Sequence, residues 1–296
     1  MNGSLKRIGF IGVGGIGRPM AERLIRQGFD LIICDRRDSA LEPFRALGAR
    51  VVHQASECAC ADIVIVMVVD DAQVLAVTTG TGGLIDGVNP DCPPLLAIMS
   101  TVLPRTVEDI AAAMAFKKVR MIDAPVSGGP IAAAKGTLSI MAGGTEQDFL
   151  AMKSGLEALG SHIFHCGALG AGEAIKILNN AMGITTQFLM TEILDMARAF
   201  DIDEILLTSI MEESSGRNFC TRDLAAQKAF FRYNIADPSL LGSLLDACRK
   251  DLRLASRLAE QADVDTPLLA AITAAHRTTP DESILASWKA ITTGCA

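Results

Sequence analysis

Apolar residues in the first half of the chain alternate between short continuous runs and stretches with helical spacing. Runs such as "RIGFI" and "IVIV" have the length of buried strands, whereas apolar positions recur every three or four residues in "IGRPMAERLIRQG", which ends at Gly28. Strands are predicted in RIGFIGVG, DLIICD, at 51–52, and in DIVIVMVV, PLLAIMS, VRMIDAP, TLSIMAGG and HIFHCG. Helices are predicted at 16–28, 39–47, from 71 onward, at 104–116 and at 146–159. This alternation predicts a parallel sheet with helices on both faces.

The pattern changes near Gly167, after which strand signals disappear. Helical spacing predicts helices over 171–200, 203–211, 240–262 and 267–275. We therefore expect an α/β domain over residues 1–166 and an all-α domain over residues 167–296, joined by the long 171–200 helix. The chain shows no internal repeat and no low-complexity segment.

Composition narrows the class of protein. Half of the 296 residues are hydrophobic, which is enough for a sizeable core. The formal net charge is −7 and no long block of Lys and Arg is present, so a nucleic-acid partner is not expected. The longest apolar runs are too short to cross a bilayer, so a membrane partner is not expected either.

The N-terminus and the cysteines indicate where the protein resides. "MNGSLKRIGF" runs directly into a strand, without the apolar segment and small-residue cleavage site of a secretion signal. The eight cysteines are scattered, and several lie in strand-like runs, as Cys34 and Cys166 do. We therefore expect a reduced, cytoplasmic protein.

A glycine motif joins the first predicted strand to the first helix. Gly12, Gly14 and Gly17 in "GFIGVGGIGRPM" have the G-x-G-x-x-G spacing of a dinucleotide-binding turn. The first glycine permits the tight turn, the second lets the backbone approach a pyrophosphate, and the third lets the helix pack on the strand. Gly15 and Ile16 complete the turn, and the helix start then offers its N–H groups to the anion. We expect a doubly wound sheet of Rossmann type that binds a dinucleotide.

Asp35 ends the second predicted strand, at the interval expected of the acid that accepts a hydrogen bond from a ribose 2′-hydroxyl. Its charge would repel a 2′-phosphate, which favours NAD as the cofactor. Arg36 and Arg37 follow directly and are able to hold a phosphate instead, so NADP remains the second candidate. The structural alternative is that Asp35 caps the next helix.

The segment "DAPVSGG" follows another predicted strand at its C-terminal end, where open α/β sheets bind ligands. Ser127, Gly128 and Gly129 offer a hydroxyl and consecutive backbone N–H groups, which suits a carboxylate. Taken alone, the segment is more typical of an ordinary Ser-Gly-Gly turn. The motifs around this segment are what favour a carboxylate-binding loop over an ordinary turn.

Lys176 lies between Ile175 and Ile177 in the helical stretch "GAGEAIKILNNAMGI". Asn179 and Asn180 follow three and four residues later, on the same face of a helix. A partly desolvated lysine suits proton transfer, because burial disfavours its charged form. The alternative is a solvated lysine on an amphipathic helix, with Asn179 as the partly buried amide.

Four motifs in this order resemble the β-hydroxyacid dehydrogenase family, which includes 3-hydroxyisobutyrate dehydrogenase and tartronate semialdehyde (2-hydroxy-3-oxopropionate) reductase. They are "GFIGVGGIGRPMAERL", "DAPVSGG…GTLSIMAGG", "GAGEAIKILNN" and "KDLRLA", and they span about Lys6 to about Leu269. The resemblance implies a Rossmann domain and an all-helical domain joined by a long helix. It also implies a homodimer or homotetramer, with the helical domain contributing to the interface.

The resemblance further implies roles for individual residues. Lys176 matches the family's catalytic lysine, Asn180 an amide that orients the substrate, and Lys250 a lysine that closes over cofactor and substrate. Two further sets match the carboxylate-binding loop and the residues beside the nicotinamide: Ser127, Gly128 and Gly129, and Ser100 with Thr101. Asp251, next to Lys250, is expected to be a surface or ion-pair residue. Ser243 stands where many members have an aromatic residue, which weakens any single substrate name.

The sequence thus predicts an NAD(P)-dependent oxidoreductase that interconverts a short 3-hydroxy carboxylate and its semialdehyde by hydride transfer. A 3-hydroxyisobutyrate-like substrate is the first expectation and tartronate semialdehyde the second. Metal binding is not expected. His162 and His165 would point to opposite faces of a strand, with no further ligands nearby.

Three other functions are less favoured. Imine reductases share the architecture but usually replace the lysine, and a non-catalytic NAD(P)-binding module is expected to lack it. 6-Phosphogluconate dehydrogenase shares the cofactor fold, but its chain is much longer. Its helix also carries a His-Asn pair where this chain has Asn179 and Asn180.

Overall fold

The computed structural model describes residues 7–293, and the chain divides into two compact units, the first ending at Lys176 and the second beginning at Ile177. This division falls inside α8 (Ala171–Ala199), which matches the helix expected over 171–200. Residues 1–6, on which the expectation about a secretion signal partly rests, lie outside the described part. Among the described helices, none is both long and apolar enough to span a membrane.

The first unit is built on one sheet, whose first six strands are parallel and lie in the order β3-β2-β1-β4-β5-β6. Phe10 of β1 pairs with Ile33 of β2 on one side and with Ile65 of β4 on the other. The strand order changes direction between β1 and β4, which is where doubly wound sheets bind their ligands. The strands are β1 (Arg7–Ile11), β2 (Asp30–Cys34), β3 (Arg50–Val52), β4 (Ile63–Val66), β5 (Leu95–Ile98) and β6 (Arg120–Asp123).

Beyond β6 the sheet departs from the parallel pattern. β8 (Leu138–Gly143) runs antiparallel to β6 and to β7 (Val126–Ser127), whereas β9 (Gly160–Gly167) runs parallel to β8. The expected parallel, doubly wound sheet is confirmed over β1 to β6, and this edge adds an antiparallel pair, because only α6 (Gly129–Lys135) separates β7 from β8. A seven-residue helix is too short for the crossover that a parallel pair requires.

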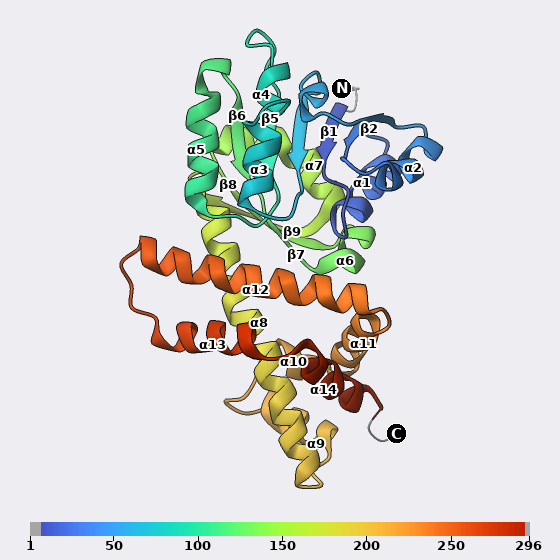
Figure 1. Cartoon of the computed structure of the whole chain (residues 1–296), viewed down its shortest axis with the longest axis vertical. Helices are drawn as coiled ribbons and strands as arrows, with labels where there is room; N and C mark the ends of the chain where they lie inside the picture. Colours follow the sequence, from blue (N-terminus) through green and yellow to red (C-terminus); the bar gives the residue numbers. More distant parts are fainter. Residues whose placement is uncertain (1–6, 294–296) are drawn as a thin grey trace. The chain divides into compact units, whose positions relative to one another are not determined.

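Both faces of the sheet are buried along β1, β2, β4 and β5, which explains the continuous apolar runs in these strands. Alternate side chains enter opposite layers, so that Ile63 and Ile65 of β4 join one apolar cluster and Val64 and Val66 the other. Helices α1, α2 and α7 complete the first cluster, and α3, α4 and α5 the second (Figure 1). Their bounds are α1 (Gly17–Arg26), α2 (Asp38–Ala46), α3 (Asp71–Thr78), α4 (Leu84–Gly87), α5 (Pro104–Met114) and α7 (Glu146–Leu159), with short 3-10 turns η1 (Ala55–Cys58) and η2 (Ala115–Lys117).

The second unit is helical over its described residues, as the sequence predicts. The expected helices are found as α9 (Glu204–Glu212), α12 (Pro238–Gln261) and α13 (Pro267–Thr278). Three more helices are present that the sequence pattern does not predict: α10 (Phe219–Arg222), α11 (Leu224–Ile235) and α14 (Asp281–Thr293). Within this unit α12 packs on α13 and α11 on α14 (Figure 1).

Candidate active site

The site residues predicted in the first unit follow the carboxyl ends of its strands. Gly12 follows β1, Asp35 follows β2, Ser100 follows β5, and Ser127 lies shortly after β6. The carboxyl ends of parallel strands meet at one edge of a sheet. The structure therefore brings the cofactor candidates of this unit to the edge where ligands of such sheets bind.

The glycine loop is closed against the protein at two positions and open between them. Gly12 has a φ of +95°, and a Cβ there would lie 2.3 Å from the carbonyl oxygen of Met67. A Cβ at Gly17 would lie 2.1 Å from the carbonyl oxygen of Gly12. Gly14 and Gly15 face open space, with nothing within 4 Å of an added Cβ. No side chain caps the start of α1. An open backbone turn before an uncapped helix start fits a pyrophosphate.

Both carboxylate oxygens of Asp35 are held by the protein. Oδ2 accepts a hydrogen bond from the backbone N–H of Val13 (3.1 Å), and Oδ1 accepts one from the backbone N–H of Arg37 (3.0 Å). The Arg37 guanidinium adds two contacts, Nε to Oδ1 at 3.0 Å and Nη2 to Oδ2 at 3.1 Å. Burial acts to raise the pKa of Asp35, but the hydrogen bonds from Arg37 and Val13 outweigh it and hold that pKa below its ordinary value. A charged carboxylate thus ties the glycine loop to the end of β2.

The capping alternative for Asp35 is not what the structure shows. The N-cap position of α2 is Arg37, and the helix itself begins at Asp38. Arg36 is exposed, and the Arg37 side chain is 61% exposed. An ion pair with so exposed a partner is weak. A ribose hydroxyl is therefore able to compete with Arg37 for the Asp35 carboxylate.

Ser100 is buried after the end of β5 and stabilises the neighbouring loop. It is 1% exposed, and its hydroxyl oxygen accepts a hydrogen bond from the backbone N–H of Val68 at 2.7 Å. This contact joins the end of β5 to the loop after β4. Thr101, the next residue, is half-buried. The two residues expected beside the nicotinamide thus differ: the Ser100 hydroxyl braces the backbone, and Thr101 is the more accessible of the pair.

The Ser-Gly-Gly loop depends on its glycines. Gly128 and Gly129 have φ values of +133° and +68°, which side chains disfavour. A Cβ at Gly128 would lie 2.6 Å from the Cβ of Ala132, whereas Gly129 faces open space. Ser127 is half-buried at the end of β7. The loop therefore has two consecutive residues with positive φ, and no other residue lies close to the backbone on the Cβ side of Gly129.

Asp123, the last residue of β6, holds the start of α8. It is fully buried, and its oxygens accept hydrogen bonds from the backbone N–H groups of Gly170 and Glu173, both at 2.7 Å. Such N–H groups at a helix start have no partner within the helix, and a carboxylate is their natural acceptor. A Cβ at Gly172 would lie 2.2 Å from the carbonyl oxygen of Met141. The glycines of "GAGE" therefore let the helix approach the sheet closely enough for Asp123 to reach it.

Lys176 is buried on α8, with 5% of its surface exposed. Its apolar neighbours Ile175 and Leu178 are 43% and 61% exposed, and Asn179 is exposed. The alternative of a solvated lysine beside a partly buried Asn179 is therefore wrong. A buried ammonium is stable only with compensating charge or hydrogen bonds around it. Glu173, one turn earlier on the same helix, is 0% exposed.

Two further predicted residues belong to the second unit, where Asp251 links them. Asn180 of α8 donates a hydrogen bond from Nδ2 to Asp251 Oδ2 at 2.6 Å. The Lys250 ammonium lies 3.0 Å from Asp251 Oδ1. Because an ionised carboxylate only accepts, it fixes which end of the Asn180 amide turns toward it. Asp251 is 8% exposed, so it is an ion-pair residue but not a surface one.

Sequence reasoning missed the buried carboxylates Asp123 and Glu173, and it did not foresee that the ion-pair residue Asp251 is buried and also binds Asn180. All three lie inside motifs that attract notice for other residues, "DAPVSGG", "GAGEAIK" and "KDL". Each one is buried, although carboxylates are rarely buried without partners. An acid next to a motif in an otherwise apolar segment is the signal that would have found them.

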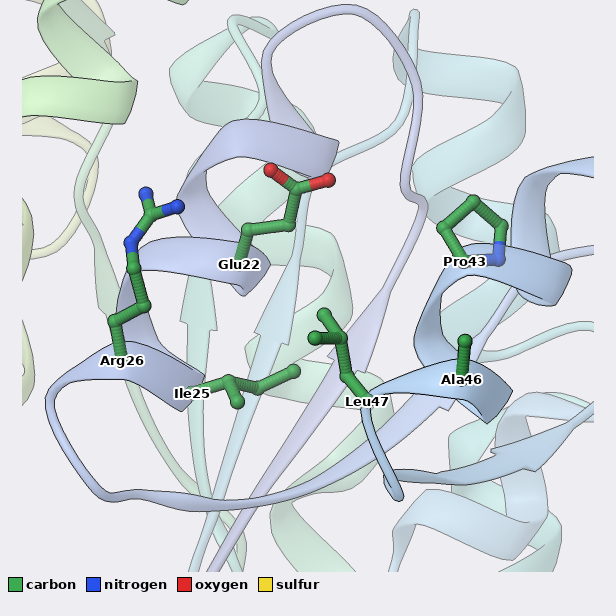
Figure 2. Close-up of a pocket in the computed structure, with 6 residues that line it drawn as sticks. All are labelled: Glu22, Ile25, Arg26, Pro43, Ala46 and Leu47. Carbon is green, nitrogen blue, oxygen red and sulfur yellow. The ribbon is translucent and has the colours of Figure 1, made fainter.

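A surface hollow elsewhere in the first unit carries no such chemistry. It lies between the later turns of α1 and α2 (Figure 2), and it is lined by Glu22, Ile25, Arg26, Pro43, Ala46 and Leu47. Glu22 forms an ion pair with Arg18 at 2.8 Å along the exposed side of α1. The hollow lies toward the C-terminal end of α1, whereas the glycine loop lies at its N-terminal end. It is therefore separate from the cofactor candidates.

Two family models match consecutive parts of the chain. The model described as "NAD binding domain of 6-phosphogluconate dehydrogenase" matches residues 7–167. The model described as "NAD-binding of NADP-dependent 3-hydroxyisobutyrate dehydrogenase" matches residues 170–286. The first match alone covers more than half of the chain, and it includes the glycine loop and Asp35.

Individual proteins agree with these models. An uncharacterised oxidoreductase of Mycobacterium tuberculosis is 34% identical over 88% of this chain and 89% of its own. The mitochondrial 3-hydroxyisobutyrate dehydrogenase of Drosophila melanogaster is 34% identical over 90% of this chain and 82% of its own. The structure of a 3-hydroxyisobutyrate dehydrogenase of M. tuberculosis with L-serine superposes with a TM-score of 0.78 and 25% identity, over 96% of this chain and 99% of that one. The chain belongs to the β-hydroxyacid dehydrogenase family and is an NAD(P)-dependent oxidoreductase of the 3-hydroxyisobutyrate dehydrogenase type.

Proposed function

We propose that the chain interconverts a short 3-hydroxy carboxylate and its semialdehyde, with Lys176 as the acid and base. The observation that carries this proposal is the burial of Lys176, at 5% exposure, on a helix whose first turn is bound by Asp123. A lysine in this position has a fixed backbone and a desolvated side chain. Both properties suit transfer of one proton at a defined atom.

The chemistry divides between cofactor and protein. The glycine loop would hold the dinucleotide, whose nicotinamide would supply the hydride acceptor for oxidation of the hydroxyl-bearing carbon and the hydride donor for reduction of the aldehyde carbon. On oxidation, the Lys176 amine takes the hydroxyl proton as the carbonyl forms. On reduction, the Lys176 ammonium gives that proton to the oxygen that becomes the hydroxyl. Ser127, Gly128 and Gly129 bind the substrate carboxylate in this proposal, and the open backbone at Gly129 supports it.

NAD is the proposed cofactor of choice. The glycine loop fits the pyrophosphate at its open positions Gly14 and Gly15. Asp35 keeps its negative charge, since its pKa lies below the ordinary value. That charge favours a ribose diol over a 2′-phosphate. Arg36 and Arg37 stand beside it on the exposed side and would provide the contacts for NADP.

Asn180 and Lys250 are proposed to contact the substrate and the cofactor. Asp251 accepts from the Nδ2 end of Asn180, and the carbonyl oxygen accepts one long hydrogen bond from Asn179 Nδ2 at 3.4 Å. The second lone pair of that oxygen remains to accept a hydrogen bond from the substrate hydroxyl. The same carboxylate holds the Lys250 ammonium. Asp251 is thereby a positioning residue for both.

Self-association through the second unit is proposed as well, with a second copy of this chain as the partner. The end of α8 and the start of α9 expose a run of large apolar side chains, and such a run on a protein surface marks an interface. They are Phe200 at 77%, Ile202 at 44%, Ile205 at 70%, Leu206 at 56% and Ile210 at 54% exposure. Ile205→Glu should lower the mass measured by light scattering to that of one chain. Phe116→Glu, at a residue 69% exposed in the first unit, is the matched control and should leave the mass unchanged. An unaltered mass for Ile205→Glu would exclude this face.

A cytoplasmic location is proposed on the state of the thiols. Within the described residues, seven cysteines are free and none forms a disulfide. Buried free thiols such as Cys58 and Cys220 suit a reducing compartment. Fractionation of cells that produce the tagged chain tests this, and recovery in an oxidising compartment would contradict it.

The experiment that tests the proposed function is a substrate panel followed by absorbance of the reduced nicotinamide. NAD and NADP are each paired with 3-hydroxyisobutyrate, D-glycerate, L-serine and 3-hydroxypropionate, and a cyclic imine is tested with NADH and NADPH. We expect oxidation of 3-hydroxyisobutyrate with NAD. A higher kcat/KM with D-glycerate would assign the chain to tartronate semialdehyde reduction. Turnover of the imine alone would overturn the proposal.

A further inference from the structure

Glu173 stands out among the buried charged residues that the proposed chemistry does not use. It is 0% exposed, and it lies in the first turn of the helix that carries Lys176. Its Oε2 accepts a hydrogen bond from the backbone N–H of Val102 at 3.1 Å. Its own backbone N–H donates to Asp123 Oδ2. One residue thus contacts the ends of both β5 and β6.

The bond to Val102 has a direct geometric consequence. Val102 follows Ser100 and Thr101, the two residues expected beside the nicotinamide. Glu173 therefore connects that segment to α8 through a buried hydrogen bond. Any displacement of α8 relative to the end of β5 must break or stretch this contact.

The spacing to Lys176 has a consequence for charge. Residues three apart on a helix are neighbours on one face, and both side chains here are buried, at 0% and 5% exposure. Burial on its own lowers the pKa of a lysine, because the charged form loses its water. A carboxylate within one turn opposes that effect, and the opposition is strong where water is scarce.

Three other titratable groups lie near the contacts of Glu173 with β6 and with the segment after β5, and each is engaged elsewhere or neutral. Asp123, from β6, accepts backbone N–H groups of the α8 start, and burial raises its pKa despite them. Asp71, from α3, accepts the hydroxyl of Thr106 at 2.6 Å at the start of α5. Cys166, from β9, has a pKa raised by burial and by Asp123, so its thiol is neutral. Glu173 is the carboxylate that shares the helix face of the lysine.

We propose that Glu173 is a positioning residue that holds Lys176 at the nicotinamide edge and sustains its positive charge. This inference rests on the proposed role of Lys176. Through the charge of Lys176, Glu173 sets which direction of the reaction is favoured at a given pH. With the carboxylate present, Lys176 is an ammonium over a wider pH range, which favours reduction of the semialdehyde. Without it, the neutral amine forms at lower pH, which favours oxidation of the hydroxy acid.

The test replaces the charge and keeps the shape. In Glu173→Gln the amide oxygen is still able to accept from Val102, while the negative charge is lost. The descending limb of kcat/KM for reduction and the ascending limb for oxidation should both move down by about one pH unit, a tenfold change in the lysine equilibrium. The cofactor KM should stay the same. Glu173→Asp keeps the charge and shortens the reach, so its limbs should lie nearer to those of the wild type while kcat falls.

A matched control comes from another buried glutamate. Glu204 lies in the first turn of α9 and pairs with Arg198 at 2.8 Å and Lys228 at 2.7 Å. Glu204→Gln removes a buried, ion-paired carboxylate of the same type from a helix that carries none of the site residues. Its pH limbs should coincide with those of the wild type. A shift equal to that of Glu173→Gln would mean that general loss of a buried charge explains the result.

A second measurement separates this inference from the proposed function. Carbon-13 NMR of protein labelled at the lysine ε-carbon follows the ionisation of Lys176, with its signal assigned by its absence in Lys176→Arg. The pKa of Lys176 should be lower in Glu173→Gln than in the wild type, whether or not any substrate is turned over. A lower pKa in a protein that oxidises no hydroxy acid would leave the charge pairing intact and remove the proposed function. An unchanged lysine pKa in a folded Glu173→Gln would overturn the inference.

Discussion

Asp251 accepts a hydrogen bond from the side-chain amide of Asn180 at 2.6 Å, across two helices that are distant in sequence. The same carboxylate pairs with Lys250 at 3.0 Å. A residue that sequence reasoning set aside thus connects two residues that the family resemblance singled out. These contacts of Asp251 therefore orient Asn180 and Lys250, the two residues of the second unit that are proposed to contact substrate and cofactor.

Asp251→Asn should impair substrate handling more than cofactor binding. The variant loses a charged acceptor for Asn180 and the partner of Lys250, and hydrogen bonds to charged groups contribute about 1.5–3 kcal/mol. We expect kcat/KM for the hydroxy acid to fall by about ten- to a hundredfold. Asp246→Asn removes a carboxylate that is 83% exposed on the same helix, and steady-state kinetics should not distinguish it from the wild type. Equal kinetics for Asp251→Asn would show that Asn180 and Lys250 are ordered without it.

Asp35→Ala should relax the discrimination against NADP. Removing the carboxylate removes the repulsion of a 2′-phosphate, and it frees the Arg37 guanidinium that Asp35 now holds through two contacts. The ratio of kcat/KM for NAD over NADP should fall by about tenfold or more. Arg37→Ala, made in parallel, should lower NADP use alone. An unchanged ratio in Asp35→Ala would mean that the carboxylate only supports the glycine loop.

The low pKa of Asp35 also predicts how stability depends on pH. The folded state holds this pKa below the ordinary value of 3.8, so ionised Asp35 stabilises the folded state at neutral pH. That contribution is complete above the ordinary pKa and is lost as the pH falls through the folded one. The melting temperature of Asp35→Asn should therefore lie below that of the wild type near neutral pH. The gap should close as the pH is lowered below about 4. A gap that stays constant would assign the difference to shape and not to charge.

Asp123→Asn should destabilise the first unit. The carboxylate accepts two backbone N–H groups of α8 in a fully buried place, and an amide would turn a donor toward one of them. An unsatisfied buried group costs about 1–3 kcal/mol, which lowers the midpoint of denaturant unfolding. Asp203→Asn, at the exposed N-cap of α9, is the control, and it should cost little because asparagine caps nearly as well. Equal midpoints for the two variants would show that Asp123 does not anchor the helix.

The sequence predicted well what depends on local pattern. Helix α7 has the predicted bounds, and α8 ends one residue before its predicted end. The glycine loop was recognised because its glycines are required locally: Gly12 has a positive φ, and Gly17 lies too close to the Gly12 carbonyl for a side chain. The apolar neighbours of Lys176 led to the expectation that its side chain is desolvated, and the lysine is buried, although the helix exposes Ile175.

Much of what the pattern missed depends on contacts between distant segments. Helices α11 and α14 form around Trp288, whose ring centre lies 4.4 Å from that of Phe231. Helix α11 buries the polar residues Gln227 and Asn234 beside Phe231, so its own apolar stripe is interrupted. Helix α14 does place Ile284, Trp288 and Ile291 at helical spacing, a local signal that the sequence analysis overlooked.

Contacts between distant segments also define the antiparallel pairing of β7 with β8. The same holds for Asp123 and Asp251, whose hydrogen-bond partners Gly170 and Asn180 lie far away in the sequence. Single-sequence periodicity does not carry that information.

Replacement of Lys176 tests the central claim most directly. Lys176→Ala and the control Lys153→Ala, which alters an exposed lysine paired with Glu157, are compared with the wild type. NADH binding is followed by fluorescence, and turnover is followed with the best substrate of the panel. We predict unchanged NADH binding in both variants and a fall in kcat of about a hundred- to ten-thousandfold in Lys176→Ala alone. Turnover by Lys176→Ala at the wild-type rate, with NADH bound normally, would contradict the assignment of Lys176 as the acid and base.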